Sequence, residues 1–477
     1  MKLRTRSHRR MPTRDGVFVY LPDSASIMRL DAEAVTVLDR FECREGLEAA
    51  EYLAETGRGR DAAAEVLEEL CDVGAIRPVE EVRPPSSSLP PMPFPLATLV
   101  LNVSSRCNLS CTYCYEYGED KLPGQGEGKR PASMSPETAL RSIDFLFESA
   151  RGRRDVSVTF FGGETLLNRE AIEAAVDHAE GLARATEKRV HFALTTNATL
   201  LDDDIIAFLI DHRFGVNISI DGDRASHDRH RSFKSGRGSY DTVVPKIRRL
   251  LAAARGRTRP IGARVTLTRP LPNLRDLYAH LTHDIGFDEV GFAPVTSAPN
   301  RDHALLGDDY DDLLAQYSAL ADDYVAAALE GHRHGFSNLG DLLRELHEGV
   351  NKAHPCGAGL GLVGVATDGE LGLCHRFVES EAHPIGDIEN GIDEDRRREF
   401  LEKGHVNRKI ECATCFARPV CAGGCYHEAE VRYGDASHPN LHYCDWIRAW
   451  TDLGLRAYAR ITDANPSFFQ RFERTSS

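Results

Sequence analysis

The sequence lacks any long apolar stretch, both after its start and further along the chain. A bilayer crossing needs about 20 consecutive apolar residues, and a signal peptide needs an apolar segment behind its basic start. We therefore expect neither, and we expect the protein in the cytoplasm. Thiols stay reduced there, so clustered cysteines bind metals more often than they form disulfides.

A positive net charge is also missing, because 58 Lys and Arg stand against 73 Asp and Glu and leave a formal charge of −15. General nucleic-acid binding needs a basic face that replaces phosphate counterions, so this function class is disfavoured. Basic residues do gather at the start, in Lys2, Arg4, Arg6, Arg9, Arg10 and Arg14. We interpret this start as a solvated or locally leader-contacting segment, with a nucleic-acid arm as the alternative.

Three cysteines stand together in Cys107-Asn-Leu-Ser-Cys111-Thr-Tyr113-Cys114, without an obvious fourth nearby. A closed structural zinc site needs four ligands, so a zinc knuckle is the weaker interpretation. An iron–sulfur cube held by three thiolates leaves one iron open. The spacing, with Tyr113 beside the last cysteine, resembles the radical S-adenosylmethionine (SAM) superfamily. This resemblance implies a [4Fe–4S] cluster on Cys107, Cys111 and Cys114 that binds SAM and cleaves it to a 5′-deoxyadenosyl radical.

Six β-like runs alternate with helical stretches in the middle of the chain, which favours parallel strands joined by helical crossovers. We expect these strands at residues 98–103, 156–161, 190–196, 216–220, 261–267 and 289–294. Six such units suit the partial (β/α)6 barrel of radical SAM proteins, an α/β fold. The cysteine loop and three polar turns each follow one of the first four strands, where β/α barrels place their chemistry.

The polar turns match the SAM-binding positions of the superfamily. Gly162-Gly163-Glu164 resembles the GGE motif that receives the SAM amino group, although Thr165 replaces the usual Pro. Glycine lets carbonyls approach the ammonium, and a carboxylate accepts from it. The resemblance further implies that Asn197 and Ser219 bind the ribose and the methionine end. Arg264 is a candidate partner for the SAM carboxylate, with an ordinary structural ion pair as the alternative.

Seven further cysteines occupy the C-terminal region: Cys356, Cys374, Cys412, Cys415, Cys421, Cys425 and Cys444. A zinc ribbon over residues 412–425 is one interpretation, but it leaves three of them unexplained. The spacing resembles the SPASM domain of peptide maturases, which carries two auxiliary [4Fe–4S] clusters. The resemblance implies that auxiliary cluster II takes Cys412, Cys415, Cys421 and Cys444, and that auxiliary cluster I takes Cys356, Cys374 and Cys425.

Auxiliary cluster I lacks the eighth cysteine that many relatives carry just before the position of Cys356. Either its iron stays open, which suits a substrate thiolate, or His354 is a ligand. His375 follows Cys374 where sulfatase-maturating relatives have an Asp base. His375 is thus a candidate base for a substrate thiol, and a histidine bonded to a carbonyl is the alternative.

The sequence pattern of the first part of the chain predicts strands at 16–21 and 26–30, helices at 31–40, 47–55 and 61–73, and an extended piece at 75–79. This small winged-helix-like unit resembles the RiPP recognition element. In that family a leader peptide adds as a strand to an exposed β edge. A folding cap and a DNA-binding winged helix are the alternatives.

We divide the chain at its proline-rich stretch and at the changes of pattern that follow. The predicted parts are a leader-binding domain at 1–83, a linker at 84–96, the radical SAM barrel at 97–300, a helical connector at 301–350, and the SPASM region with a C-terminal helix at 351–477.

The predicted function is a radical SAM maturase of a leader-bearing polypeptide. Residues 423–429 and 442–446 resemble the maturases of the quinohemoprotein amine dehydrogenase small subunit, which implies Cys-to-Asp or Cys-to-Glu thioether crosslinks. Carbon–carbon crosslinking or another oxidative maturation is the alternative within this class. An iron–sulfur winged-helix regulator is disfavoured, because a sensor needs no GGE turn and the N-terminal helical stretches are acidic. The resemblance implies a flavodoxin- or ferredoxin-type electron donor, and we expect no DNA or membrane partner.

Overall fold

A computed structural model describes residues 2–44, 46–55, 60–80, 89–115, 121–125 and 130–473. Residues 84–88 of the predicted linker lie outside the described residues. Among the described residues, no helix combines the length and the apolar character of a membrane span.

The centre of the fold is a set of six parallel strands that lie side by side in chain order. They are β7 (Thr98–Ser104), β8 (Asp155–Gly162), β9 (Arg189–Thr196), β10 (Gly215–Ser219), β11 (Gly262–Leu267) and β12 (Glu289–Pro294). All six predicted strands are confirmed, each within one residue at either end. Parallel order along the chain requires that every crossover return on the same side of the sheet.

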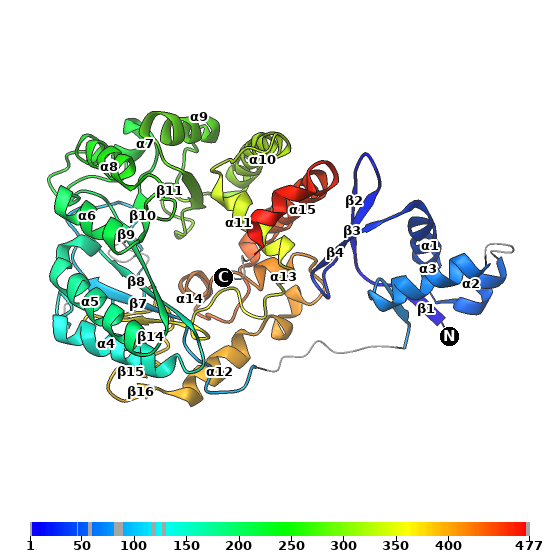
Figure 1. Cartoon of the computed structure of the whole chain (residues 1–477), viewed down its shortest axis with the longest axis horizontal. Coiled ribbons are helices and arrows are strands. Elements are labelled where there is room, and N and C mark those ends of the chain that lie inside the picture. Colours follow the sequence, from blue (N-terminus) through cyan, green and yellow to red (C-terminus); the bar gives the residue numbers. More distant parts are fainter. Residues whose placement is uncertain are drawn as a thin grey trace.

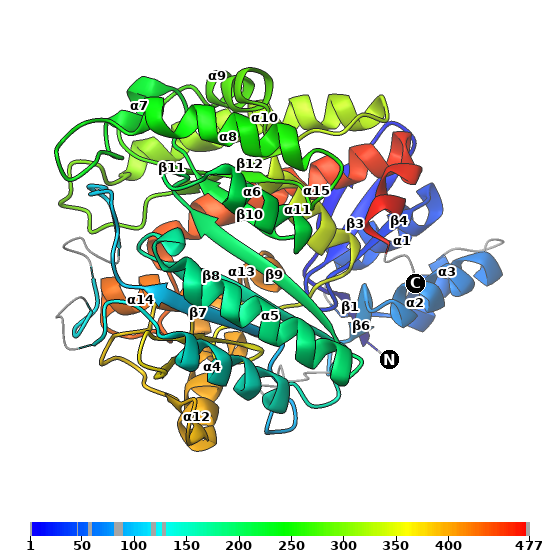
Figure 2. The ribbon, with the colours of Figure 1, turned by 60° about the vertical axis from the view of Figure 1, so that its left-hand side comes forward.

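The crossover helices are α4 (Pro136–Ser149), α5 (Arg169–Ala185), α6 (Asp203–Asp211), α7 (Arg224–Asp228), α8 (Tyr240–Ala254) and α9 (Leu274–Ala279). Side-chain caps fix their starts: Ser135 accepts from the Thr138 N–H at α4, and Asp202 accepts from the Ile205 N–H at α6. Figures 1 and 2 show α4, α5, α6 and α8 along one side of the sheet. The C-terminal region, with α13 (Arg418–Cys421) and α14 (Tyr426–Tyr433), lies on the other side (Figure 1).

Two short strands of the C-terminal region extend this sheet beyond β7, which the sequence pattern did not predict. β13 (Leu362–Val365) pairs in parallel with β7, and β14 (Leu371–Gly372) pairs antiparallel with β13. A Cβ on Gly364 would lie 2.6 Å from the carbonyl carbon of Cys374. The chain around Cys374 is therefore packed onto the same sheet whose first strand leads into the cysteine loop.

The described part of the N-terminal region holds two small antiparallel sheets and three helices. One sheet has the order β2 (Arg9–Pro12), β3 (Val17–Leu21), β4 (Ser26–Leu30), and the other has the order β5 (Leu47–Glu48), β1 (Lys2–Thr5), β6 (Ile76–Pro78). The helices are α1 (Ala32–Cys43), α2 (Ala49–Glu55) and α3 (Arg60–Asp72).

The interpretation of the basic start as a solvated segment is wrong, because β1 and β2 are strands of these sheets. Basic residues alternate there with apolar ones, and Leu3 and Met11 are buried. Alternation of this kind is the pattern of a strand with one covered face. Arg10 forms ion pairs with Asp39 and with Glu42, so its charge is matched within the region.

Strand β3 divides its side chains between two cores. Phe18 and Tyr20 join the main core, whereas Val19 and Leu21 join the core beneath the N-terminal helices. Figure 1 shows the β2–β3–β4 sheet between these helices and α15 (Cys444–Ala464). The N-terminal region is thus docked on the C-terminal part through a sheet that is covered on both faces.

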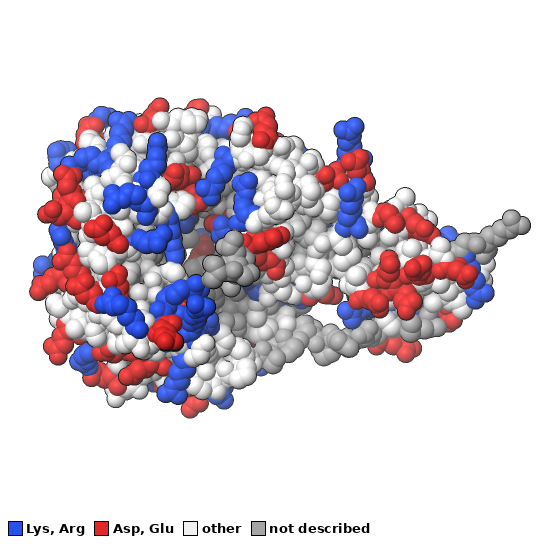
Figure 3. All heavy atoms as spheres, in the orientation of Figure 1, with Lys and Arg blue, Asp and Glu red and all other residues white. Residues whose placement is uncertain are grey.

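The remaining helices α10 (Gly307–Leu329) and α11 (Ser337–His347) pack on α15, and α12 (Glu394–Gly404) follows the hairpin of β15 (Gly386–Asp387) and β16 (Gly391–Ile392). On the face in Figure 3, acidic side chains gather over the N-terminal helices. Glu65, Glu68 and Glu69 of α3 are exposed. These helices lack the basic face that a DNA-recognition helix presents.

Candidate functional site

A cavity of about 510 Å³ opens where the parallel strands end. It brings together all the residues predicted for the SAM site except Arg264: Cys107, Cys111, Tyr113, Cys114, Gly162, Gly163, Glu164, Asn197 and Ser219. Thr266 of β11 and Ala293 of β12 complete the series of strand ends. The convergence follows from topology, because the carboxyl ends of parallel strands meet at one edge.

The glycine turn after β8 lies tightly against the chain that enters the cysteine loop. Gly162 has a φ of 140°, and a Cβ there would lie 2.3 Å from the Ser104 carbonyl oxygen. The Gly163 N–H donates to that same oxygen at 2.9 Å. Only glycine combines this dihedral with this approach, so the turn fixes the cysteine loop against β8.

Gly162→Ala is expected to lower the free energy of unfolding by roughly 1–3 kcal/mol, because it adds both φ strain and a backbone clash. Gly152→Ala is the matched control, since Gly152 has a φ of 74° but has no atom within 4 Å of an added Cβ. Chemical denaturation of the two variants measures the difference. Equal losses in both variants would show that the close approach to Ser104 has no energetic role.

Glu164 is 1% exposed, and its carboxylate accepts three hydrogen bonds from the chain. The donors are the Thr196 hydroxyl at 2.6 Å, the Asn197 N–H at 2.8 Å and the Leu166 N–H at 3.1 Å. Burial raises the pKa of Glu164, while these three donors act in the opposite direction. Glu164 therefore ties the end of β8 to the end of β9. A carboxylate has about four acceptor positions, so capacity for one further donor remains.

Asn197 fixes the other side of the cysteine loop. Its Nδ2 donates to Asn108 Oδ1 at 3.0 Å and lies 3.8 Å from Cys107 Sγ, while its Oδ1 accepts from Thr199. The first thiol of the loop is thus positioned by a residue that also lines the cavity.

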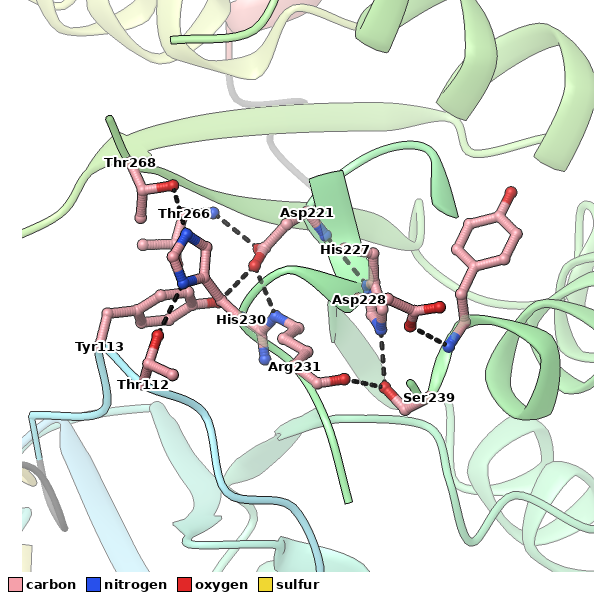
Figure 4. A network of polar contacts seen from close by, with 11 residues as sticks. Thr112, Tyr113, Asp221, His227, Asp228, His230, Arg231, Ser239, Thr266 and Thr268 are labelled. Carbon is pink, nitrogen blue, oxygen red and sulfur yellow. Dashed lines mark hydrogen bonds and ion pairs between the residues drawn. The ribbon is translucent and has the colours of Figure 1, made fainter. Parts of the chain in front are cut away.

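Asp221 is the centre of a buried network beneath the loop (Figure 4). Its carboxylate accepts from the Tyr113 hydroxyl, from Arg231 Nε at 3.0 Å and from the Thr266 N–H at 3.0 Å. Arg231 also lies 5.4 Å from the centre of the Tyr113 ring. The sequence pattern did not assign Asp221 or Arg231 to the site. The Ser219-Ile-Asp-Gly run, which begins at the last residue of β10, could have indicated Asp221 as a residue at a strand end.

Residues 101–262 match the radical SAM superfamily. The chain carries a radical SAM domain. It is 23% identical over 378 residues, 76% of this chain and 95% of the relative, to the cysteine-type anaerobic sulfatase-maturating enzyme of Clostridium novyi. It is 31% identical over 162 residues, 33% of this chain and 37% of the relative, to the serine-type anaerobic sulfatase-maturating enzyme of Bacteroides thetaiotaomicron.

Solved structures share the radical SAM fold. Native anSMEcpe with bound AdoMet superposes with a TM-score of 0.62 at 21% identity, covering 78% of this chain and 100% of that one. Streptococcus suis SuiB bound to the precursor peptide SuiA gives 0.52 at 14% identity, covering 91% and 100%. The chain thus combines a radical SAM domain, which is built on a parallel sheet, with a small N-terminal β region and a cysteine-rich C-terminal region.

Besides the seven C-terminal cysteines, Arg264 and His375 are predicted site residues that do not line the cavity of the radical SAM domain. Arg264 is exposed on β11, and its Nε donates to Asn217 Oδ1 at 3.1 Å. His375 packs with its ring centre 4.5 Å from that of Phe161. Burial, together with the Arg376 charge, lowers the pKa of His375 to about 3, which makes a neutral but weak base. Their assigned roles stay predictions.

The C-terminal cysteines influence one another's pKa in two sets. Burial raises the pKa of Cys374 to about 12, with contributions from Cys425 and Cys356. Burial also raises the pKa of Cys412 to about 11, with Lys409 opposing it and Cys421, Cys415 and Cys444 adding to it. Thiols whose loss of water outweighs the effect of nearby cations suit a cationic iron centre, which deprotonates them on binding.

No three His, Cys, Asp or Glu side chains of the described residues lie close enough to hold a single metal ion. A cube of four irons, by contrast, separates its ligand sulfurs more widely than one ion does. His354 Nδ1 lies 2.8 Å from the Tyr426 hydroxyl, and its Nε2 is buried with no hydrogen-bond partner in the described part of the chain. Burial lowers the pKa of His354 to about 4, so the imidazole is neutral near pH 7.

Proposed function

We propose that this chain is a peptide maturase that crosslinks a cysteine sulfur to a carbon of an Asp or Glu residue in a leader-bearing polypeptide. The supporting observation is the cavity that joins the cysteine loop and the strand ends to Arg376, two residues after Cys374. Two of the similar solved structures also support a peptide substrate. One anSMEcpe structure holds the Kp18Cys peptide, and the SuiB structure holds the precursor peptide SuiA.

Cys107, Cys111 and Cys114 are proposed to hold the SAM-binding [4Fe–4S] cluster, which with SAM supplies a 5′-deoxyadenosyl radical. The chain's own residues then bind and orient. The Gly162–Gly163 turn would receive the SAM amino group, and Asn197 and Ser219 line the cavity near the ends of the next two strands. The cavity walls exclude water and other hydrogen donors from the reactive carbon.

The C-terminal region is proposed to be a SPASM domain with two auxiliary [4Fe–4S] clusters. Cys412, Cys415, Cys421 and Cys444 complete one set of four ligands. Cys356, Cys374 and Cys425 supply three ligands to the other, and its remaining iron position is proposed to receive the substrate thiolate, with His354 ligation as the alternative. A flavodoxin- or ferredoxin-type protein is the proposed electron donor.

The N-terminal region is proposed to bind the leader peptide, with the domain boundaries given under Sequence analysis. Both faces of the β2–β3–β4 sheet are covered, and within the described residues β2 and β4 each pair with β3 alone. Their outer edges keep backbone groups that a leader strand can pair with.

Hydrogen–deuterium exchange on the full-length chain tests this assignment. Adding the polypeptide encoded beside the gene is expected to slow amide exchange in β2 or β4, because a new strand would pair with their free N–H groups. Protection confined to residues outside the N-terminal region would contradict leader binding at this sheet.

Anaerobic incubation of the reconstituted protein with reductant and SAM tests the proposed chemistry itself. Formation of 5′-deoxyadenosine is expected. Its complete absence would rule out the radical reaction, whatever the substrate.

A further inference from the structure

Arg376 has an unusual position between the two cysteine-rich parts of the molecule. All other described residues that line the radical SAM cavity lie between positions 105 and 296, and Arg376 is the one contributed by the C-terminal region. It lies two residues after Cys374 in the sequence. The nearby Cys425 and Cys374 both raise the pKa of its guanidinium. Its guanidinium therefore lies where the cavity adjoins the Cys356, Cys374 and Cys425 set.

The guanidinium of Arg376 has no ion pair and no hydrogen bond with any residue that the structure describes. Its charged carbon lies 4.5 Å from the centre of the Tyr115 ring, which covers one face of the group. Glu428, a carboxylate that raises the pKa of Arg376, has its Oε1 3.0 Å from His442 Nε2. The five N–H donors at the edge of the guanidinium are thus available toward the cavity.

The two arginines that are buried among the described residues, by contrast, have carboxylate partners. Arg231 pairs with Asp221 at 3.0 Å, and Arg397 donates to the carbonyls of Gly359 and Phe94 and pairs with Glu394. Burying a charged group without partners is costly, so an unpaired guanidinium that lines a cavity is a binding group for an anion.

The charge of the cavity favours the same conclusion. Its described basic residues are Arg106, Arg231, Lys234 and Arg376, whereas Glu164 is its one described carboxylate. The Glu164 carboxylate accepts from Leu166, Thr196 and Asn197 and forms no ion pair with Arg376, so among the described residues the guanidinium stays unpaired. Arg106 and Arg231 belong to the wall of the cysteine loop, where SAM is proposed to bind.

We propose that Arg376 binds the side-chain carboxylate of a substrate Asp or Glu and so selects acidic residues for modification. The inference rests on the proposed function and names the residue type that the cavity accepts. A planar guanidinium matches a carboxylate through two parallel hydrogen bonds, and neither a thiol nor an amide offers that pairing. A carboxylate held there places its neighbouring carbons in the radical SAM cavity, beside the proposed site for the substrate sulfur.

Deuterium transfer tests the selection with synthetic peptides in place of the natural substrate. Two pools of cysteine-containing peptides are used, one with side-chain-deuterated Asp and Glu and the other with deuterated Asn and Gln. Each pool is incubated anaerobically with the reconstituted full-length protein, reductant and SAM, and deuterium in 5′-deoxyadenosine is measured by mass spectrometry. Transfer from the acidic pool is expected to exceed transfer from the amide pool roughly 10- to 100-fold, the range for a charged hydrogen-bond partner.

Arg376→Gln is expected to remove this preference by lowering transfer from the acidic pool by the same factor, and Arg376→Lys is expected to restore part of it. Arg398→Gln, an exposed charge-neutralising change on α12, is the matched control and should keep the preference. SAM affinity and iron content are measured for each variant.

Each other result has a distinct meaning. Equal transfer from both pools, deuterium from neither pool, or an unchanged preference in Arg376→Gln overturns the inference while SAM cleavage persists. Weaker SAM binding in that variant would instead make Arg376 a SAM ligand, and lost iron would make it a support for the auxiliary cluster. A wild-type protein that forms no 5′-deoxyadenosine contradicts the proposed function itself.

Discussion

Replacing Cys107 by Ala is expected to reduce 5′-deoxyadenosine formation to the background level. The loop offers only three thiols, and two thiolates are too few to hold a cube that must also keep one iron open for SAM. Cys107 is held in place by its neighbours, because its sulfur accepts from the Leu109 N–H at 3.4 Å and lies 3.8 Å from Asn197 Nδ2. Iron content is expected to fall by roughly a third if three clusters are present.

The matched control for this variant is Cys43→Ala, because Cys43 is an exposed thiol at the end of α1 in the N-terminal region. It should cleave SAM like the wild-type protein and keep its iron. Liquid chromatography of the quenched reaction measures the product. Normal SAM cleavage by the Cys107 variant would contradict the assignment of the loop as the SAM-binding centre.

Replacing Cys356 by Ala is expected to separate SAM cleavage from crosslinking. Cys356 belongs to the set with Cys374 and Cys425, which lies in the C-terminal region and shares no residue with the cysteine loop. The variant should therefore form 5′-deoxyadenosine but leave the substrate mass unchanged, since the proposed thiolate site is lost. Iron content is again expected to fall by roughly a third.

Cys71→Ala provides the control here, because Cys71 is a partly buried thiol of α3 that is remote in sequence from both cysteine sets. It should retain iron, SAM cleavage and crosslinking. A crosslinked product from the Cys356 variant at the wild-type yield would show that its set has no part in bond formation. Loss of SAM cleavage as well would show that the two centres are not separable.

The strand ends of the site could be predicted from sequence because hydrophobic periodicity and topology determine them together. Alternating runs located the six strands, and parallel order then required Gly162, Asn197 and Ser219 to converge. Periodicity did not reveal how far a residue lies from the carboxyl end of its strand. Arg264, two residues before the cavity-lining Thr266, was for that reason assigned to SAM but bonds to Asn217 outside the lining.

The features that sequence reasoning missed depend on contacts between distant segments. Strands β13 and β14 hold four and two residues, too short for a periodic signal, and they form because β7 offers a free edge. At the start of the chain, basic and apolar residues alternate, and this alternation predicts the strands β1 and β2 better than the basic charge predicts a solvated segment. Arg376 lines the cavity because the C-terminal region packs onto the sheet, and this packing is not visible in the sequence. The sequence around Cys374 therefore led to His375 instead.

The most direct test of the account is the mass of the polypeptide encoded beside the gene after anaerobic incubation with the reconstituted protein, reductant and SAM. Each crosslink joins a carbon to a sulfur and removes one hydrogen from each. The account predicts a loss of two hydrogen atoms per crosslink, blocked alkylation of the bonded cysteine, and accompanying 5′-deoxyadenosine. An unchanged mass with every cysteine still open to alkylation, while 5′-deoxyadenosine accumulates, would contradict thioether formation.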